Sequence, residues 1–235
     1  MLDGRIVVVT GANQGLGEAI AQKFADAKAT VWLVARNAEK LEVAAKKINA
    51  GGGVAKFQPC DLADIGQVKS CVATILAADK QIDILINNAA MWIQGDIAGS
   101  DPVDIQKVFD VNAVGNIYIT QAAVEGMKAA KSGQVININS LAGIEADKNW
   151  PVYSATKYAM RGFSEALKAD VEGTGIKVSD VYPGGINTNL YTNAGLDIVD
   201  QPWMMKKEDI AEIILTIASQ PADIVMDHVE IRKVG

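Results

Sequence analysis

The sequence predicts an α/β fold built on a doubly wound, mostly parallel sheet with helices on both of its faces. Short apolar runs rich in β-branched residues, such as residues 6–9 and 82–86, are typical of strands buried on both faces. Segments with apolar residues at helical spacing separate these runs, and a glycine-rich turn joins the first run to the first such segment. Strands that alternate with helices imply right-handed crossovers between parallel strands.

The elements are expected to alternate along the whole chain. Strands are predicted at residues 6–9, 30–35, 54–58, 82–86, 134–139, 176–182 and 229–234. One long helix is expected from Pro102 past Ala123, and another from Pro151 to about Val171, because proline suits the first position of a helix. A last helix is expected near Glu208. A chain of 235 residues is long enough for one large domain, residues 1–235, and too short for two.

Composition and charge argue against several classes of partner. The formal charge of -6 disfavours nucleic acid, whose phosphates need a concentrated basic surface. No apolar run approaches the length of a membrane span, and the sequence opens without the pattern of a secretory signal. Cys60 and Cys71 are too few for a disulfide framework or a metal cage. We therefore expect a cytoplasmic protein with reduced thiols and without a metal, nucleic-acid or membrane partner.

The turn after the first strand is a candidate phosphate-binding site. Residues 10–17 read TGANQGLG, between a buried strand and a helix. In such a turn Gly11 lets the chain reverse, Gly15 lets the backbone approach a pyrophosphate, and Gly17 lets the helix pack tightly on the strand. Three residues rather than one separate the first two glycines, so the spacing differs from the G-x-G-x-x-G fingerprint.

The ends of the second and third strands indicate which dinucleotide would bind. In NAD sites an acidic residue near the end of the second strand accepts hydrogen bonds from the adenosine ribose. This sequence has Ala35 and Arg36 there, and a guanidinium can bind a 2′-phosphate that a carboxylate would repel. We therefore predict NADP; the alternative is that Arg36 is a solvated residue at a strand end. Asp61, after the third strand, is expected beside the adenine.

Tyr153 and Lys157 form a candidate acid–base pair. Residues four apart on a helix share a face, and a nearby ammonium favours the phenolate and lowers the tyrosine pKa. Ser140 stands at the C-terminal end of the fifth strand, where ligands bind in open α/β sheets. Taken alone, Tyr-x-x-x-Lys is more often a surface lysine beside a half-buried tyrosine, and Ser140 could simply cap a turn. A hydrolase triad around Ser140 is disfavoured, because the single histidine, His228, lies near the C-terminus and is expected in the sheet.

Together these motifs resemble the short-chain dehydrogenase/reductase family. The resemblance covers residues 5 to about 190 and implies a Rossmann-type, seven-stranded sheet in the order 3-2-1-4-5-6-7. It also implies an NADP-dependent enzyme of the carbonyl reductase or alcohol dehydrogenase type, and the family uses the wider glycine spacing found here. Seven features follow the order and approximate spacing of the family: Thr10-Gly-x-x-x-Gly-x-Gly17, Asp61, Asn87-Asn88-Ala89-Ala90, Asn112, Ser140, Tyr153-x-x-x-Lys157 and Pro183-Gly184.

The resemblance implies roles for individual residues. Tyr153 would protonate the substrate oxygen and Ser140 would bind and polarise it. Lys157 would lower the Tyr153 pKa and hold the nicotinamide ribose. Asn112 would hold a water on a proton path, the alternative being a satisfied amide of the core. The residues predicted to bind the cofactor are Gly11, Asn13, Gln14, Gly15, Leu16, Gly17, Arg36, Asp61, Leu62, Asn88, Ala89, Tyr153, Lys157, Pro183, Gly184, Ile186 and Thr188.

Three departures from the family pattern affect these predictions. Ala90 replaces the glycine that commonly ends the asparagine motif, which is a small change. Gln14 stands where many NADP-preferring members have a second basic residue, so Arg36 is the one visible cation for the 2′-phosphate. Residues 228–235 lack the family's frequent Val-Asp-Gly-Gly-type tail, which often supports tetramer contacts in relatives.

The sequence also suggests how the substrate and a second subunit would be met. Residues 189–205 show no clear periodicity and are the expected lid, to which Leu196 and Met205 also belong. Without an arginine in the expected pocket, a neutral, fairly apolar carbonyl compound or alcohol is predicted. The expected pocket residues are Met91, Trp92, Ile144, Trp150, Tyr191, Trp203 and Met204. The resemblance implies a homodimer or homotetramer paired through the two long helices, where a second apolar stripe is expected at Val124, Met127, Ala159, Phe163 and Leu167.

Two other classes of function are weighed against an NADP-dependent oxidoreductase. A nucleotide-sensing regulator without turnover would usually have lost a catalytic group. The four predicted catalytic residues are all present, namely Asn112, Ser140, Tyr153 and Lys157. A different enzyme on the same scaffold remains an alternative, such as a 3-oxoacyl thioester reductase, a dehydratase or an epimerase. The compact lid and short tail disfavour the last two.

Overall fold

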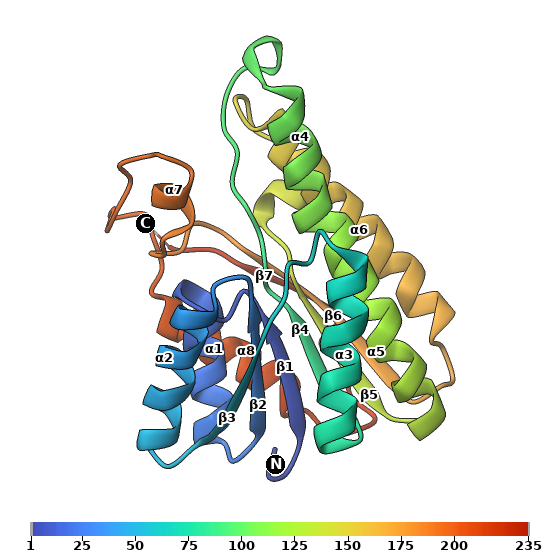
Figure 1. Ribbon diagram of the computed structural model, residues 1–235. Coiled ribbons are helices and arrows are strands. Elements are labelled where there is room, and N and C mark those ends of the chain that lie inside the picture. Colours follow the sequence, from blue (N-terminus) through green and yellow to red (C-terminus); the bar gives the residue numbers. More distant parts are fainter. Residues whose placement is uncertain (1, 235) are drawn as a thin grey trace.

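Seven parallel strands form one sheet in the computed structural model, which describes residues 2–234 (Figure 1). The strands are β1 (Ile6–Thr10), β2 (Thr30–Ala35), β3 (Val54–Pro59), β4 (Ile84–Asn87), β5 (Gly133–Ile138), β6 (Ile176–Pro183) and β7 (His228–Ile231). Their order is β3-β2-β1-β4-β5-β6-β7 and every pairing is parallel. The predicted fold class and strand order are confirmed.

Two strands are shorter than the sequence pattern indicated. The fourth was predicted from residue 82 and begins at Ile84. The seventh was predicted at residues 229–234, but it begins at His228 and ends at Ile231. His228 therefore belongs to the sheet, as predicted. The seventh strand ends at Ile231 because its partner β6 ends there: the last pair of the register joins Ile231 to Pro183, the final residue of β6.

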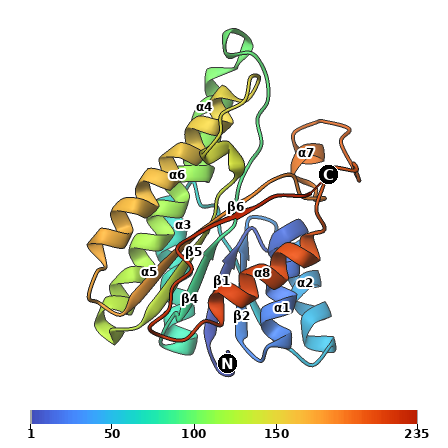
Figure 2. The same cartoon turned by 180° about the vertical axis from the view of Figure 1, so that it is seen from behind.

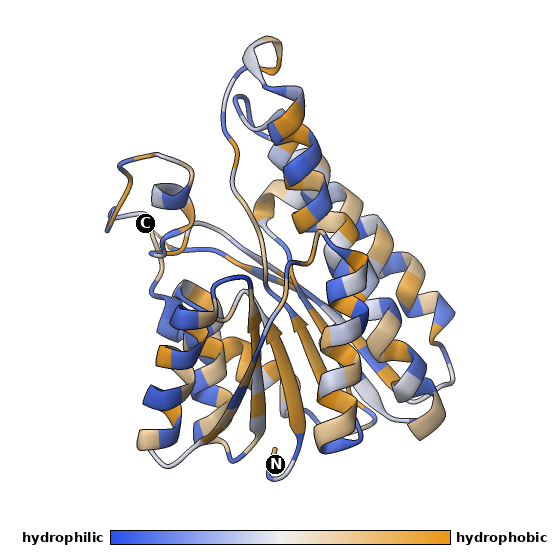
Figure 3. Ribbon diagram, viewed as in Figure 1, coloured by the Kyte–Doolittle hydropathy of each residue, from blue (hydrophilic) through white to orange (hydrophobic). Residues whose placement is uncertain are grey.

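Helices cover both faces of the sheet (Figures 1 and 2). On one face lie α1 (Gly15–Asp26), α2 (Ala38–Ala50) and α8 (Lys207–Ala218), and on the other lie α3 (Ile65–Asp79), α5 (Asn116–Ala130) and α6 (Pro151–Asp170). Val7 and Val9 pack with the first group and Val8 packs with the second, as the alternation of a strand requires. The central strands β1 and β4 are accordingly largely apolar, and they appear orange in Figure 3. Among residues 2–234, no helix combines the length and the apolar character needed to cross a membrane.

The predicted long helix from Pro102 is not continuous. It consists of α4 (Pro102–Phe109), a π-helical turn over Asp110–Gly115, and α5. The Asn116 Nδ2 donates to the carbonyl oxygens of Val111 and Asn112 at 3.2 and 3.0 Å, which stabilises the wider turn. Gly115 lies so close to Leu62 that any side chain at this position would collide with it. The π-helical turn therefore brings this helix against the segment that follows β3.

Candidate active site

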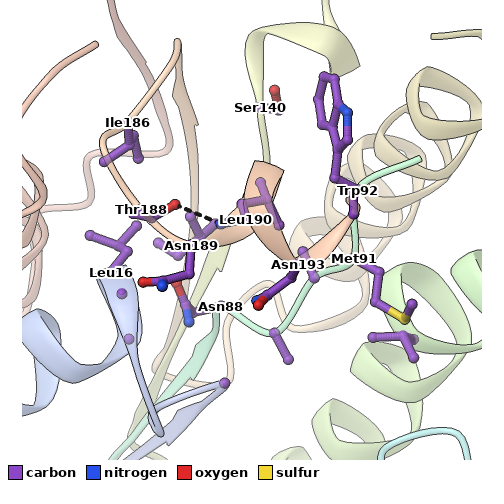
Figure 4. Close-up of a pocket in the computed structure, with 18 of the residues that line it drawn as sticks. Leu16, Asn88, Met91, Trp92, Ser140, Ile186, Thr188, Asn189, Leu190 and Asn193 are labelled. Atoms are coloured by element: carbon purple, nitrogen blue, oxygen red, sulfur yellow. Dashed lines mark hydrogen bonds between the residues drawn. The ribbon is translucent and has the colours of Figure 1, made fainter. Parts of the chain in front are cut away.

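The carboxyl ends of the parallel strands meet at one edge of the sheet, and the predicted site residues follow these ends. Every residue predicted to bind the cofactor lines one cleft of about 790 Å³ at this edge, and so does Ser140. Figure 4 shows part of this cleft, with Leu16 and Asn88 from its cofactor side and Met91 and Trp92 from its substrate side. Asn112 is the one predicted site residue that does not line the cleft.

The glycine turn is held against the turn that follows β4. The Thr10 Oγ1 accepts hydrogen bonds from the backbone N–H groups of Asn88 and Ala89 at 2.9 and 3.0 Å, and the Asn88 Nδ2 donates to the Thr10 carbonyl oxygen at 2.8 Å. Gly11 has a φ of 66°, and a Cβ there would lie 2.9 Å from the Ala89 Cα. A Cβ at Gly17 would meet the Gly11 carbonyl oxygen. The turn therefore forms a cradle that larger residues would close.

A second cation lies at the end of the cleft that holds Arg36. Lys40, in the first turn of α2, lines the cleft, and its Nζ donates to the Gln14 Oε1 at 3.1 Å. The expectation that Arg36 stands alone is therefore wrong. The signal was present in the sequence, because a lysine four residues after Arg36 falls on the first turn of the helix that follows β2.

The cleft fits an NADP molecule at this end. The glycine cradle leaves room for a pyrophosphate, and no side chain caps the first turn of α1. Arg36 and Lys40 supply the positive charge that a 2′-phosphate requires.

Tyr153, Ser140 and Lys157 meet at the other end of the cleft. Tyr153 and Lys157 lie on the buried face of α6, each with 3% of its surface exposed. The Lys157 Nζ donates to the Ile138 carbonyl oxygen at 3.2 Å and lies 5.7 Å from the centroid of the Tyr153 ring. The Ser140 Oγ accepts from the Ala142 backbone N–H at 3.1 Å. Ser140 thus caps a short 3-10 turn and faces the cleft as well.

The pKa of Tyr153 differs in direction from the prediction. Burial raises the pKa of the phenol above its ordinary value, and the Ser140 hydroxyl only partly opposes this rise. Lys157 was expected to lower it, but the ammonium is directed to the Ile138 carbonyl oxygen. Burial in turn lowers the pKa of Lys157 to about 8, against the opposing charge of Asp180. At neutral pH Tyr153 therefore keeps its proton and Lys157 is still mostly charged.

Asn112 is a satisfied amide of the core. Its Oδ1 accepts from the Met91 backbone N–H at 2.7 Å, and its Nδ2 donates to the Met91 carbonyl oxygen at 2.8 Å and to the Thr156 Oγ1 at 3.2 Å. The side chain therefore ties the segment after β4 to α6. Its part in a proton path remains a prediction.

Aromatic rings surround Tyr153 on the substrate side. The Trp92 ring centroid lies 4.4 Å from that of Tyr153, 5.0 Å from that of Trp150 and 5.1 Å from that of Tyr191. Trp203 continues the series, with its centroid 5.9 Å from that of Tyr191. The predicted pocket residues that line the cleft are Met91, Trp92, Trp150, Tyr191 and Trp203.

Two predicted pocket residues do not line the cleft. Met204 is buried, and the Ile144 carbonyl oxygen accepts from the Tyr158 hydroxyl. The sequence reasoning also missed polar lining residues, because variable loops carry no periodicity that reveals their direction. Among these residues are Gln94, Lys107, Asn139, Asn189 and Asn193.

The predicted lid, residues 189–205, contains the short helix α7 (Leu190–Asn193). Its two ends lie side by side, because the Asn187 N–H donates to the Met205 carbonyl oxygen and the Met205 N–H donates to the Gly185 carbonyl oxygen, both at 2.9 Å. The Lys233 Nζ donates to the Met204 carbonyl oxygen at 2.9 Å. The lid is therefore a loop whose base is closed by hydrogen bonds.

Comparisons with known proteins place the chain among oxidoreductases. The family model described as short chain dehydrogenase matches residues 5–198. An uncharacterized oxidoreductase of Staphylococcus aureus (strain USA300) is 32% identical over 234 residues, which cover 100% of this chain and 99% of the relative. A dehydrogenase/reductase SDR family protein 7-like of Drosophila melanogaster is 38% identical over 198 residues, which cover 82% of this chain and 60% of that protein.

Solved structures agree with this result. A metagenomic short-chain oxidoreductase in complex with NADP is 30% identical and superposes with a TM-score of 0.87 over 99% of this chain and 98% of its own. The closed form of a serine dehydrogenase complexed with NADP+ is 28% identical, with a TM-score of 0.88 over 97% and 94% of the two chains.

Proposed function

Because the chain belongs to the short-chain dehydrogenase/reductase family, we propose that it transfers hydride between NADP(H) and a neutral carbonyl compound or secondary alcohol. One observation carries this proposal. Tyr153, Ser140 and Lys157 meet in the same cleft as the glycine cradle and Arg36. A proton donor thus lies in one continuous cleft with a dinucleotide site.

In this proposal, different residues of the cofactor side bind different parts of the NADP molecule. The glycine cradle and the first turn of α1 take the pyrophosphate, and Arg36 with Lys40 takes the 2′-phosphate. Asp61 and Leu62 flank the adenine, and Lys157 holds the nicotinamide ribose. Bound NADPH supplies the hydride. Two similar solved proteins contain NADP, which supports this assignment.

The chemistry left to the protein is proton transfer and charge stabilisation. Tyr153, whose raised pKa keeps the phenol protonated, donates its proton to the substrate oxygen during reduction. The Ser140 hydroxyl donates a hydrogen bond to the same oxygen, where negative charge develops. Lys157 keeps a positive charge near the Tyr153 ring at neutral pH.

The substrate side favours neutral compounds with apolar or planar groups. Trp92 lies over Tyr153, so a carbonyl group that reaches the phenol must contact the indole ring or displace it. Lys107, on α4, is the lining residue that could attract a carboxylate to this side. It is exposed and screened by solvent, so it contributes little to the binding of an acid.

The test is a screen of NADPH oxidation with ketones, aldehydes, 3-oxoacyl thioesters, oxosteroids and small 2-oxo acids. NADP+ reduction with hydroxysteroids and with serine covers the opposite direction. We expect the highest kcat/KM with neutral, apolar carbonyl compounds. Serine or a pyruvate-sized acid as the best substrate would contradict the pocket assignment. NADPH binding without turnover of any class would instead favour a nucleotide-sensing regulator.

A further inference from the structure

A chain of hydrogen-bonded, buried side chains crosses the core beneath the site. The Asp180 Oδ1 accepts from the Ser164 Oγ at 2.8 Å, and the Ser164 Oγ accepts from the Asn137 Nδ2 at 2.7 Å. The Asn87 Nδ2 donates to the Asn137 Oδ1 at 2.8 Å and to the Thr120 Oγ1 at 2.7 Å. None of these five residues is more than 2% exposed. This series of hydrogen-bonded side chains thus links β6, α6, β5, β4 and α5.

Asp180 is the one charged member of this chain. It is 0% exposed, and its Oδ2 has no hydrogen-bond partner among the described residues. The nearest cation is Lys168, whose Nζ lies 3.8 Å from that oxygen. Burial raises the pKa of Asp180 to about 6, so the carboxylate is ionised above that pH. A buried charge with one hydrogen bond is costly, and an apolar residue would pack here at lower cost.

The position of Asp180 relates it to Lys157. Asp180 is paired in register with Asn137, and the carbonyl oxygen of the next residue, Ile138, accepts the hydrogen bond of the Lys157 Nζ. Lys157 and Ser164 are seven residues apart on α6, so they lie on one face, roughly 10 Å apart along the helix. Carboxylate and ammonium are therefore buried between the same helix and the same strand pair.

We propose that Asp180 is a positioning residue whose buried carboxylate keeps Lys157 in its ammonium form. Ser164 and Asn137 fix this carboxylate beside α6, and the charge acts across the core. Asp180 has no part in contacting substrate or cofactor, and acts only through Lys157. The proposal rests on the proposed function, because the charge of Lys157 matters where it serves the cofactor and Tyr153.

Other charges around the pair are accounted for. Lys168 and His228 act to lower the pKa of Asp180, and the negative charge of Glu165 raises it. Asp180 opposes the effect of burial on the Lys157 pKa. Over the roughly 10 Å of helix that separates Lys157 from Ser164, the hydrogen-bond partner of the carboxylate, a charge in a partly polar interior changes a pKa by about one unit. The titratable groups that face the pair are Tyr153, Glu165 and Lys168 on α6, Tyr182 on β6 and His228 on β7.

The direct test is an NMR titration of protein carrying 13C at the lysine Cε. The Lys157 signal is assigned by its loss in Lys157→Met. We expect its midpoint to fall by about one pH unit in Asp180→Asn and in Asp180→Val. Asp227→Asn is the matched control, because Asp227 is an exposed carboxylate beside Asp180 in space and its backbone carbonyl oxygen accepts from the Asp180 N–H. In Asp227→Asn, the midpoint of the Lys157 signal should equal that of the wild type.

A melting curve separates this role from a structural one. The Asp180 pKa is raised from 3.8 to about 6, so the native state gains stability from its protonated form below pH 3.8 and loses that contribution as the pH rises through 6. At pH 8 the charge is therefore destabilising, and Asp180→Asn, whose amide oxygen can still accept from the Ser164 hydroxyl, should melt no lower than the wild type. A folded Asp180 variant with an unchanged Lys157 midpoint would overturn the proposal.

Cofactor binding provides the functional readout. Quenching of tryptophan fluorescence by NADPH gives the dissociation constant at each pH without a substrate. At pH 8, a one-unit fall of the Lys157 midpoint reduces its charged fraction, and hence the affinity, by about fivefold. Lys157→Met should abolish this pH dependence. Shifted NMR midpoints in a protein that fails to oxidise NADPH would contradict the proposed function and leave the electrostatic coupling intact, so the two failures are distinguishable.

Discussion

At the scale of single residues, the environment of Tyr153 decides which of its two protonation states would take part in the proposed reaction. The buried phenol retains its proton at neutral pH, so it is prepared to donate to a carbonyl oxygen. For the reverse reaction, the phenol must lose its proton, which requires a nearby positive charge. Under the proposed function, we therefore expect the charge of Lys157 to be more important in alcohol oxidation than in carbonyl reduction.

Removal of this phenol hydroxyl should stop the chemistry and leave the cofactor site intact. In Tyr153→Phe we expect turnover to fall by about 100- to 10,000-fold, the usual contribution of a general acid. The NADPH dissociation constant should change little, because the ring still packs on Trp92. Stopped-flow or steady-state NADPH oxidation gives the first quantity and fluorescence titration the second. A mutant rate equal to that of the wild type would refute the catalytic assignment.

We propose that the two cations at the far end of the cleft, Arg36 and Lys40, determine the choice of cofactor. We predict that the enzyme prefers NADPH to NADH by about 10- to 100-fold in kcat/KM, from charge-assisted bonds to the 2′-phosphate. Ala35→Asp with Arg36→Ile should reverse this preference, because the carboxylate would bind the ribose and repel the phosphate.

Lys40 extends this prediction beyond what the sequence indicated. Lys40→Met should reduce the NADPH preference by about 3- to 10-fold, a modest effect because an exposed lysine is screened by solvent. Lys46→Met is the matched control, since Lys46 lies on the same helix, is exposed and does not line the cleft. Equal efficiencies of the wild type with the two cofactors would mean that neither cation contacts the phosphate.

Sequence reasoning correctly placed in the cleft the residues whose position depends on local chain geometry. Gly11, Arg36 and Ser140 stand at strand ends, and the ends of parallel strands must meet. Lys40 was overlooked although its place in the first turn of the helix after β2 was visible, whereas the surroundings of Asp180 depend on how distant elements pack and were not visible in the sequence. The direction of the Tyr153 pKa shift was wrong for the same reason, because the spacing to Lys157 said nothing about the depth of burial.

At the scale of elements, the π-helical turn between α4 and α5 distinguishes the structure from the sequence pattern. The apolar periodicity runs through residues 102–123 without a break, so a continuous helix was the natural prediction. The interruption is fixed by Asn116, whose amide reaches carbonyl oxygens at Ala89, Val111 and Asn112. The hydrogen bond to Ala89 joins the turn to a segment 27 residues away, whereas the other two lie within the turn.

Loss of the Asn116 amide should destabilise the protein. Asn116→Ala leaves buried carbonyl groups without partners, so we expect the free energy of unfolding to fall by about 1–3 kcal/mol. Urea denaturation monitored by circular dichroism measures this change. As a control, Gln121→Ala on the exposed side of α5 should change the stability by less than about 0.5 kcal/mol. Equal stabilities of both variants would show that the amide does not hold the turn.

At the scale of the whole molecule, the residues expected to form a subunit interface are only partly available. Val124, Met127 and Leu167 are buried in the core of a single chain, so that part of the expectation is wrong. Phe163 is half-buried, and Ala159 is exposed on the outer side of α6. Burial in one chain is not visible in a helical pattern, because a broad apolar face can be covered from within.

We nevertheless propose that the chain pairs through the outer faces of α5 and α6. Small exposed residues such as Ala159 and Gly162 allow close approach of two helices, and Tyr158 adjoins them. Light scattering should give at least twice the chain mass of 24.9 kDa at micromolar concentration. Ala159→Glu should halve that mass, whereas Ala50→Glu on the opposite face of the sheet should not. A wild-type monomer would refute the proposal.

The closed base of the lid has a consequence for how this protein could diversify. The chain leaves the frame after Gly185 and returns at Met205 through adjacent hydrogen bonds, so the intervening loop can change in length at a small entropic cost. The glycine turn lies outside this loop, whereas Ile186 and Thr188, at the start of the loop, line the cofactor side of the cleft and have to be retained. New substrate ranges can therefore arise by exchange of the lid, residues 189–205, while the sheet and its surrounding helices stay unchanged.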